Sequence, residues 1–292
     1  SVCVSWATTG IKSFQDLRTR GMIVGGTGEG ADTDTCPKVM NNVLGTKLKL
    51  VTGYPGGADI LFAMERGELE GRCGYSWSSA VTTHGDWLRD KKMNVLVQIS
   101  TERHPDLPDV PFIMDLAEND QDRLILEFIF ARQAWGRPFV APPGVPADRA
   151  RALQDGFMAV TQDPAFIADV KKQKLEVNAL PGPKVAQLIA RMNQTPLEVV
   201  NLAREATDKR DKIQISKVKL KEITVKGSIS DITKGGRAVM FEGGGQKGEL
   251  AISGSRTKIT IGGAKASRKQ LKKGMSCEFV YTGSSAKAIS CS

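Results

Sequence analysis

The sequence predicts an α/β fold with a largely parallel sheet, followed by a small all-β domain. Before Asp211, short apolar segments alternate with glycine loops and amphipathic helical runs, which is typical of a parallel sheet covered by helices. After Asp211, the sequence changes to strand-like alternation that is rich in Gly, Ser and Lys. We therefore expect two domains, over residues 1–210 and 211–292.

The charge is divided at the same place. The 292 residues include 41 Lys+Arg and 32 Asp+Glu, a formal net charge of +9. Residues 213–292 hold 15 basic and 5 acidic side chains (+10), whereas residues 1–212 hold 26 and 27 (−1). The positive surplus, which would indicate a polyanion partner if it covered the whole protein, therefore belongs to the second domain.

The order of strand, glycine loop and helix occurs twice near the start. Met22–Val24 runs into Gly25–Asp32 and a helix over 33–44, and Lys47–Thr52 runs into Gly53–Gly57 and a helix over 58–66. We expect further strands at 70–75, 93–99 and 138–140, and further helices at 14–20, 124–133, 147–161, 164–172, 184–192 and 196–206. In the helix over 147–161, the apolar residues Ala150, Leu153, Phe157 and Val160 share one face, which we expect to be core.

The first glycine loop is the main candidate for a ligand site. It fits the dinucleotide pattern GxGxxA, but the next strand ends at Val51–Tyr54 without the acidic residue that would hold a ribose, so no nicotinamide cofactor is expected. The N–H groups at a helix start can instead hold a carboxylate. A tight turn without a ligand is the alternative, and the second glycine loop at the same sheet edge favours ligand binding.

The sequence offers little for catalysis or metal binding. Gly74–Ser78 lacks the last glycine of the GxSxG nucleophile elbow, and no acidic residue is spaced to orient His84. A hydrolase that uses Ser76 is therefore only an alternative. His84 and His104 are too isolated for a zinc site, and no CxxC occurs. We expect no catalytic residue, metal or cofactor.

Five cysteines are present. Cys277 and Cys291 fall in the second domain, where a disulfide would fit an oxidising compartment; buried free thiols are the alternative.

An ordered series of motifs extends over some 190 residues. Its members are Gly25–Gly30 after a strand, Leu44–Thr46 at a helix end, Val51–Gly57, Ala63–Gly71, the turn His104–Pro111 and the segment Pro138–Pro146. In this series, Phe14 to Ala206 resembles the periplasmic substrate-binding proteins of tripartite tricarboxylate transporters, the Bug-type family.

The resemblance implies a type II periplasmic-binding-protein-like fold, in which two lobes close on a small carboxylate and deliver it to the membrane permease subunits. It implies a periplasmic monomer, with a second lobe at about 14–130 and a partial first lobe at about 1–13 and 131–210. Most of the first lobe and a signal peptide would be absent, so we expect weak binding. The implied ligand contacts, largely through main-chain groups, are Thr27, Gly28, Gly30, Ala31, Tyr54, Gly56, Gly57, Ser76 and Trp77. Glu29 and Asp32 depart from the family pattern by adding negative charge there.

In the second domain, strands are expected at 218–230, 237–241, 248–252, 257–261, 276–281 and 286–290. Leu271–Met275, Cys277–Tyr281 and Lys287–Ile289 resemble small OB-like barrels of secreted bacterial proteins. Nucleic-acid binding by such a barrel requires exposed aromatic residues, and Phe241, Phe279 and Tyr281 are expected in the strand core. A basic surface for envelope anions, or for nucleic acid, is therefore the alternative function rather than the main one.

Overall fold

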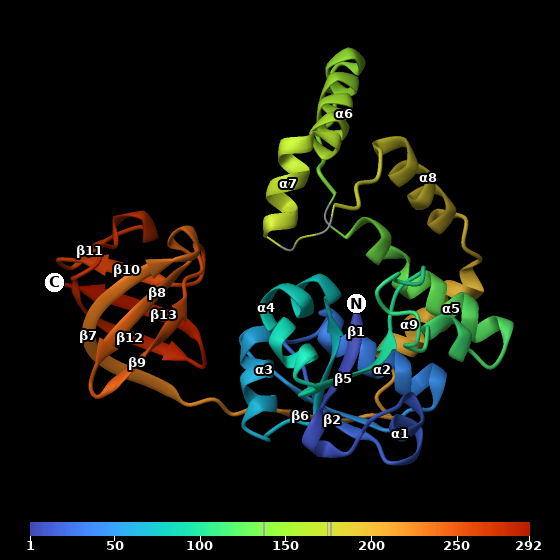
Figure 1. Cartoon of the computed structure of the whole chain (residues 1–292), viewed down its shortest axis with the longest axis horizontal. Coiled ribbons are helices and arrows are strands. Elements are labelled where there is room, and N and C mark those ends of the chain that lie inside the picture. Colours follow the sequence, from blue (N-terminus) through green and yellow to red (C-terminus); the bar gives the residue numbers. More distant parts are fainter. Residues whose placement is uncertain (137, 174, 176) are drawn as a thin grey trace. The chain divides into compact units, whose positions relative to one another are not determined.

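The computed structural model describes residues 1–136, 138–173, 175 and 177–292, which divide into two compact units. The first unit comprises residues 1–24, 29–50 and 70–215, and the second comprises residues 25–28, 51–69 and 216–292. A six-stranded sheet lies mainly in the first unit, and a seven-stranded sheet lies in the second (Figure 1). No helix in these described ranges is long and apolar enough to cross a membrane.

The six-stranded sheet contains both parallel and antiparallel pairs. Its strands, in the order β5-β1-β4-β2-β3-β6, are β5 (Met93–Gln98), β1 (Val2–Trp6), β4 (Gly71–Tyr75), β2 (Met22–Gly25), β3 (Leu48–Thr52) and β6 (Gln214–Lys217). β2 and β4 pair in parallel, whereas β1 lies antiparallel between β4 and β5. The prediction of an α/β fold is confirmed, and β1 and β6 are strands that the sequence did not reveal.

Each of the predicted helices overlaps an observed helix, and α4 is an additional one. The helices are α1 (Phe14–Thr19), α2 (Asp32–Leu44), α3 (Gly57–Glu65), α4 (Trp77–Arg89), α5 (Asp120–Phe130), α6 (Ala147–Gln162), α7 (Pro164–Lys172), α8 (Gly182–Asn193) and α9 (Leu197–Asp208). α4 was not predicted, because its Ser, Thr and Gly residues have low helix propensity. It begins where the Ser76 hydroxyl accepts a hydrogen bond from the Ser79 N–H, 3.5 Å away.

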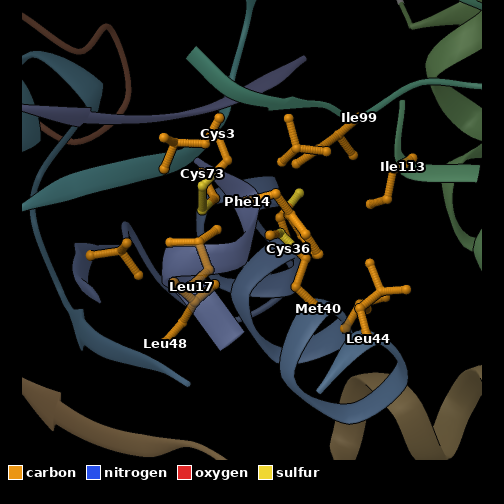
Figure 2. Close-up of a cluster of buried hydrophobic side chains, with 14 of the residues drawn as sticks. Cys3, Phe14, Leu17, Cys36, Met40, Leu44, Leu48, Cys73, Ile99 and Ile113 are labelled. Atoms are coloured by element: carbon orange, nitrogen blue, oxygen red, sulfur yellow. A yellow bond between two sulfur atoms is a disulfide. The ribbon is translucent and has the colours of Figure 1, made fainter. Parts of the chain in front are cut away.

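A buried core joins α1 and α2 to the six-stranded sheet (Figure 2). Leu17 of α1 and Met40 of α2 are fully buried there. Cys3 of β1 and Cys73 of β4 form a disulfide within this core, which the sequence did not predict. The Cys36 thiol of α2 is free, and burial raises its pKa to about 12. The core thus fastens α2 to β1 and β4.

The apolar face of α6 is exposed, so the prediction that it belongs to the core is wrong. Leu153, Phe157 and Val160 are 63%, 41% and 51% exposed, and Ala150 is only partly buried. The predicted strand Pro138–Val140 is also wrong: it is irregular chain, and Phe139 contacts the Phe157 ring at 5.0 Å. A strand needs a paired neighbour and an apolar face needs an opposing surface; the described residues supply neither.

Replacing Leu153 by Gln is therefore expected to change the free energy of unfolding by less than about 0.5 kcal/mol. A core leucine behaves differently: Leu126→Ala in α5, whose side chain is fully buried, should cost about 2–5 kcal/mol. Urea denaturation followed by tryptophan fluorescence would measure both variants. A loss at Leu153 comparable to that at Leu126 would contradict the exposed position of this face.

The seven-stranded sheet closes on itself. Its order is β11-β10-β13-β12-β7-β8-β9, and β9 also pairs with β13, so that β7, β8, β9, β13 and β12 form a ring. The strands are β7 (Glu222–Thr233), β8 (Ala238–Gly243), β9 (Gln246–Ala251), β10 (Lys258–Ile261), β11 (Ala264–Lys265), β12 (Ser276–Thr282) and β13 (Ser285–Cys291). Phe241, Phe279 and Tyr281 are buried inside, as predicted.

Cys277 and Cys291 lie opposite each other on β12 and β13 and form a disulfide, which is one of the two alternatives left open by the sequence. The start of this β domain lies later than the charge pattern indicated. β6 follows Asp211 but pairs in the six-stranded sheet, and Ile213 is buried in the core of the first unit. The seven-stranded sheet itself begins at Glu222.

Candidate functional site

The nine predicted ligand-binding residues lie where β2, β3 and β4 end and the next helix begins. Thr27, Gly28, Gly30 and Ala31 separate β2 from α2; Tyr54 and Gly56 precede α3, and Gly57 is its first residue; Ser76 caps α4, and Trp77 is its first residue. β4, β2 and β3 are neighbours in the sheet. Since β2 and β4 are parallel, α2 and α4 both begin beyond the same edge.

In the first unit, the starts of α2 and α4 are brought together by Gly74. This residue has φ +68°, and a Cβ placed on it would lie 2.6 Å from the carbonyl carbon of Asp32. The end of β4 therefore touches the first turn of α2. The two predicted pairs in this unit, Gly30–Ala31 and Ser76–Trp77, flank this contact in the sequence.

The start of α2 is suited to an anion that comes from outside the helix. Its cap residue, Ala31, has no side-chain oxygen, whereas the hydroxyl or amide oxygens of Ser76 and Asn119 cap α4 and α5. A carboxylate at such a helix start is stabilised by main-chain N–H groups and by the helix dipole. Gly28 and Gly30, with φ +138° and +81°, give the preceding loop a backbone path that only glycine adopts readily.

Glu29 and Asp32, the two acidic residues between Gly28 and Thr33, are each paired with arginine. Asp32 forms an ion pair with Arg132 of the 3-10 turn Ala131–Trp135, and Glu29 pairs with Arg210 at 2.9 Å. All four side chains are exposed by more than a third, so the pairs add little stability. They do offset the negative charge that Glu29 and Asp32 bring to this loop.

Trp77 is held by the turn His104–Pro111. Its indole N–H donates to the Asp106 carboxylate at 3.5 Å, and its ring meets the His104 ring edge to face at 6.3 Å. The buried Gln98 side chain holds this turn in place, because its amide donates hydrogen bonds to the carbonyls of Leu107 and Val110. Trp77 is thus a positioned, half-buried side chain at the start of α4.

The Ser76 hydroxyl is bonded to residues at the start of α4. Among the residues that the structure describes, its hydroxyl is bonded to the Ser78 hydroxyl at 3.0 Å and to the Ser79 N–H, and to no imidazole. The His84 Nδ1 lies 3.0 Å from the Tyr75 hydroxyl and 2.7 Å from the Thr83 hydroxyl. The role of Ser76 in this geometry is to cap α4.

A cluster that the sequence did not indicate lies beside this site. The Arg72 guanidinium stacks over the Tyr75 ring at 4.3 Å, and burial lowers the pKa of Arg72 and raises the pKa of Tyr75. In a regular strand, residues three apart point to opposite faces. The left-handed Gly74 and the irregular register between β1 and β4 bring Arg72 and Tyr75 together.

In the second unit, the two glycine loops are joined by main-chain hydrogen bonds. The Gly26 N–H donates to the Val51 carbonyl at 2.9 Å, and the Tyr54 N–H donates to the Gly26 carbonyl at 3.0 Å. The Tyr54 side chain is 4% exposed, and burial raises its pKa. Tyr54 therefore lies directly beside the loop that carries Thr27 and Gly28. A ligand role for Tyr54, Gly56 and Gly57 stays a prediction.

No protein-family model matches the chain, and no curated protein does. Solved structures that are similar to it include the following two. A TctC solute binding protein from Polaromonas, without ligand, has 13% identity and a TM-score of 0.48 over 69% of this chain and 65% of that chain. An R. palustris protein with adipate has 15% identity and a TM-score of 0.46 over 70% of this chain and 64% of that chain. The chain thus spans less than two thirds of the length of either protein.

Proposed function

We propose that the chain is a periplasmic solute receptor of the Bug type, which binds a small carboxylate and delivers it to the permease subunits of a tripartite tricarboxylate transporter. The observation that carries the proposal is the start of α2: a glycine loop beyond β2, a cap residue without a side-chain oxygen, and the two exposed acidic residues Glu29 and Asp32, each paired with arginine. This arrangement suits a carboxylate held by main-chain N–H groups.

Other observations support the same proposal. The ordered series of motifs between Phe14 and Ala206 favours the Bug-type family. Two disulfides are typical of a protein from an oxidising compartment such as the periplasm. In this proposal the receptor is a monomer without chemistry of its own, Trp77 and Ser76 border the ligand from α4, and the ring of strands in the second unit is an OB-like barrel.

Nuclear magnetic resonance titration of the full chain with succinate and citrate, at millimolar concentrations, tests this function. We expect saturable shifts of the main-chain amide signals of Gly28, Gly30 and the first turn of α2. Ala31→Asp should weaken binding at least about tenfold, because the new carboxylate would accept the N–H bonds offered to the ligand; the same change should stabilise the helix by about 1 kcal/mol. Loss of binding would then not result from loss of folding.

A matched control is Pro196→Asp, which adds the same side chain at the start of α9, where the cap residue also lacks a side-chain hydrogen bond. This variant should bind carboxylates as the wild type does. The proposal is overturned if neither carboxylate shifts the glycine-loop amides, or if Pro196→Asp weakens binding as much as Ala31→Asp.

A further inference from the structure

A positively charged pocket lies at the seam where the end of β9 meets the start of β13. Its polar lining is provided by Ser253, Arg256, Arg268, Ser285 and Lys287, and Pro55 of the second glycine loop also lines it. None of the described residues that line it is acidic. The seam itself is the β9–β13 pairing of Ala251 with Ser285. Part of the positive charge of the β domain is therefore gathered in a pocket, which three cationic side chains and two hydroxyl groups line.

The two arginines of this pocket converge on one turn. The main-chain N–H of Arg256 donates to the Ser253 hydroxyl at 3.2 Å, and its side-chain Nε lies 3.5 Å from the same oxygen. The Arg268 guanidinium also reaches this turn, with Nη1 4.0 Å from the position that a Cβ would take on Gly254. Both guanidinium groups therefore lie against residues 253–256.

The turn is fixed before any ligand arrives. The Ser253 N–H donates to the Thr257 hydroxyl at 2.9 Å, and that hydroxyl donates to the Ala286 carbonyl of β13 at 2.8 Å. On the other side, a capping box between Ser267 and Gln270 holds the 3-10 turn Arg268–Gln270. Because both supports are hydrogen-bonded, little ordering of the main chain is needed on binding.

Three cationic side chains line this pocket, and the nearby Asp59 carboxylate accepts hydrogen bonds from the Ser284 N–H and hydroxyl at 2.7 and 3.0 Å. Lys287 pairs with Glu222 at 2.6 Å, so its charge is largely compensated. Arg256 and Arg268 form no ion pair with any carboxylate in residues 1–136, 138–173, 175 and 177–292. Two guanidinium groups present planar sets of N–H donors that match the oxygens of phosphate and similar anions.

We propose that this pocket binds a tetrahedral dianion, phosphate or sulfate, either free or as the terminal group of a larger molecule. Arg256 and Arg268 hold its oxygens with charge-assisted hydrogen bonds, and the hydroxyls of Ser253 and Ser285 are additional donors. Such a site gives the basic charge of the β domain a specific ligand.

Isothermal titration calorimetry of the full chain with sodium phosphate and sodium sulfate, at constant ionic strength, tests the proposal. We expect saturable binding with one site per chain. Arg256→Ala or Arg268→Ala should weaken it at least about tenfold, which is typical for loss of hydrogen bonds to a charged group. Arg268→Lys keeps the charge but loses the planar donors, and should also weaken binding.

Lys269→Ala is the matched control, because it removes the same charge from an exposed neighbour that does not line the pocket. We expect less than about a twofold change, since exposed charges contribute little. Dimethyl phosphate, a monoanion like the nucleic-acid backbone, should bind more weakly than phosphate. Non-saturable uptake, an equal effect of Lys269→Ala, or equal affinity for dimethyl phosphate would each overturn the proposal.

Discussion

Replacing Gly74 by Ala is expected to lower the free energy of unfolding of the first unit by about 3 kcal/mol. The left-handed backbone at Gly74 (φ +68°) costs a residue with a Cβ about 1–2 kcal/mol. The Cβ would also lie 2.6 Å from the carbonyl carbon and 2.7 Å from the carbonyl oxygen of Asp32. Because these are main-chain atoms, the start of α2 must move, and overpacking of this kind costs about 1–3 kcal/mol.

Urea denaturation followed by tryptophan fluorescence measures this loss selectively, because Trp6, Trp77, Trp87 and Trp135 all lie in the first unit. Gly156→Ala in α6 is the control: its Cβ would meet no atom within 4 Å, and alanine should favour the helix by up to about 1 kcal/mol. Displacement of α2 should also weaken carboxylate binding in Gly74→Ala. An unchanged unfolding midpoint would contradict the close contact between β4 and α2.

The local order of elements could be predicted from the sequence because it depends on near neighbours. The glycine after β2 and the apolar spacing of α2 placed that strand and helix to within one residue of their observed bounds. Strands of the β domain could be predicted for the same reason: alternating apolar residues and glycine turns mark β8, β9, β12 and β13. Predicting the glycine loops as the candidate site required only this local information.

Features that depend on distant partners could not be predicted in this way. β1 and β6 are short strands. They pair with β4 and β3, which lie far from them in the sequence, so local patterns do not indicate them. The stacking of Arg72 on Tyr75 depends on the irregular register at Gly74, which strand periodicity does not contain. The apolar face of α6 depends on a distant partner in the same way. Its periodicity predicted burial, but burial requires an opposing surface, and the face is exposed.

The charge pattern placed the domain boundary too early for a related reason. The net charge of a segment does not decide which sheet its strand pairs with. β6 lies on the basic side of the composition change, yet it pairs at the edge of the six-stranded sheet next to β3. The ion pairs of Glu29 and Asp32 likewise join residues 181 and 100 positions apart, so no sequence spacing indicates them.

The disulfide between Cys3 and Cys73 is expected to contribute about 4 kcal/mol to the stability of the first unit. It closes a loop with a sequence separation of 70 residues, and a constraint of this length removes more entropy from the unfolded chain than a short one. The double variant Cys3→Ala, Cys73→Ala removes the bond without leaving a thiol in the core. Its urea midpoint, measured by tryptophan fluorescence, should fall accordingly.

The second disulfide provides the matched control. Cys277 and Cys291 are separated by 14 residues, so their bond should contribute about 3 kcal/mol, but to the second unit. Cys277→Ala, Cys291→Ala should therefore leave the tryptophan transition unchanged, since no tryptophan lies in that unit. Dithiothreitol should lower the wild-type transition to that of Cys3→Ala, Cys73→Ala and leave that variant unaffected. Mass spectrometry would show that both bonds are reduced. If the wild-type transition is nevertheless unchanged, the packing of β1 against β4 stabilises the sheet without the covalent link.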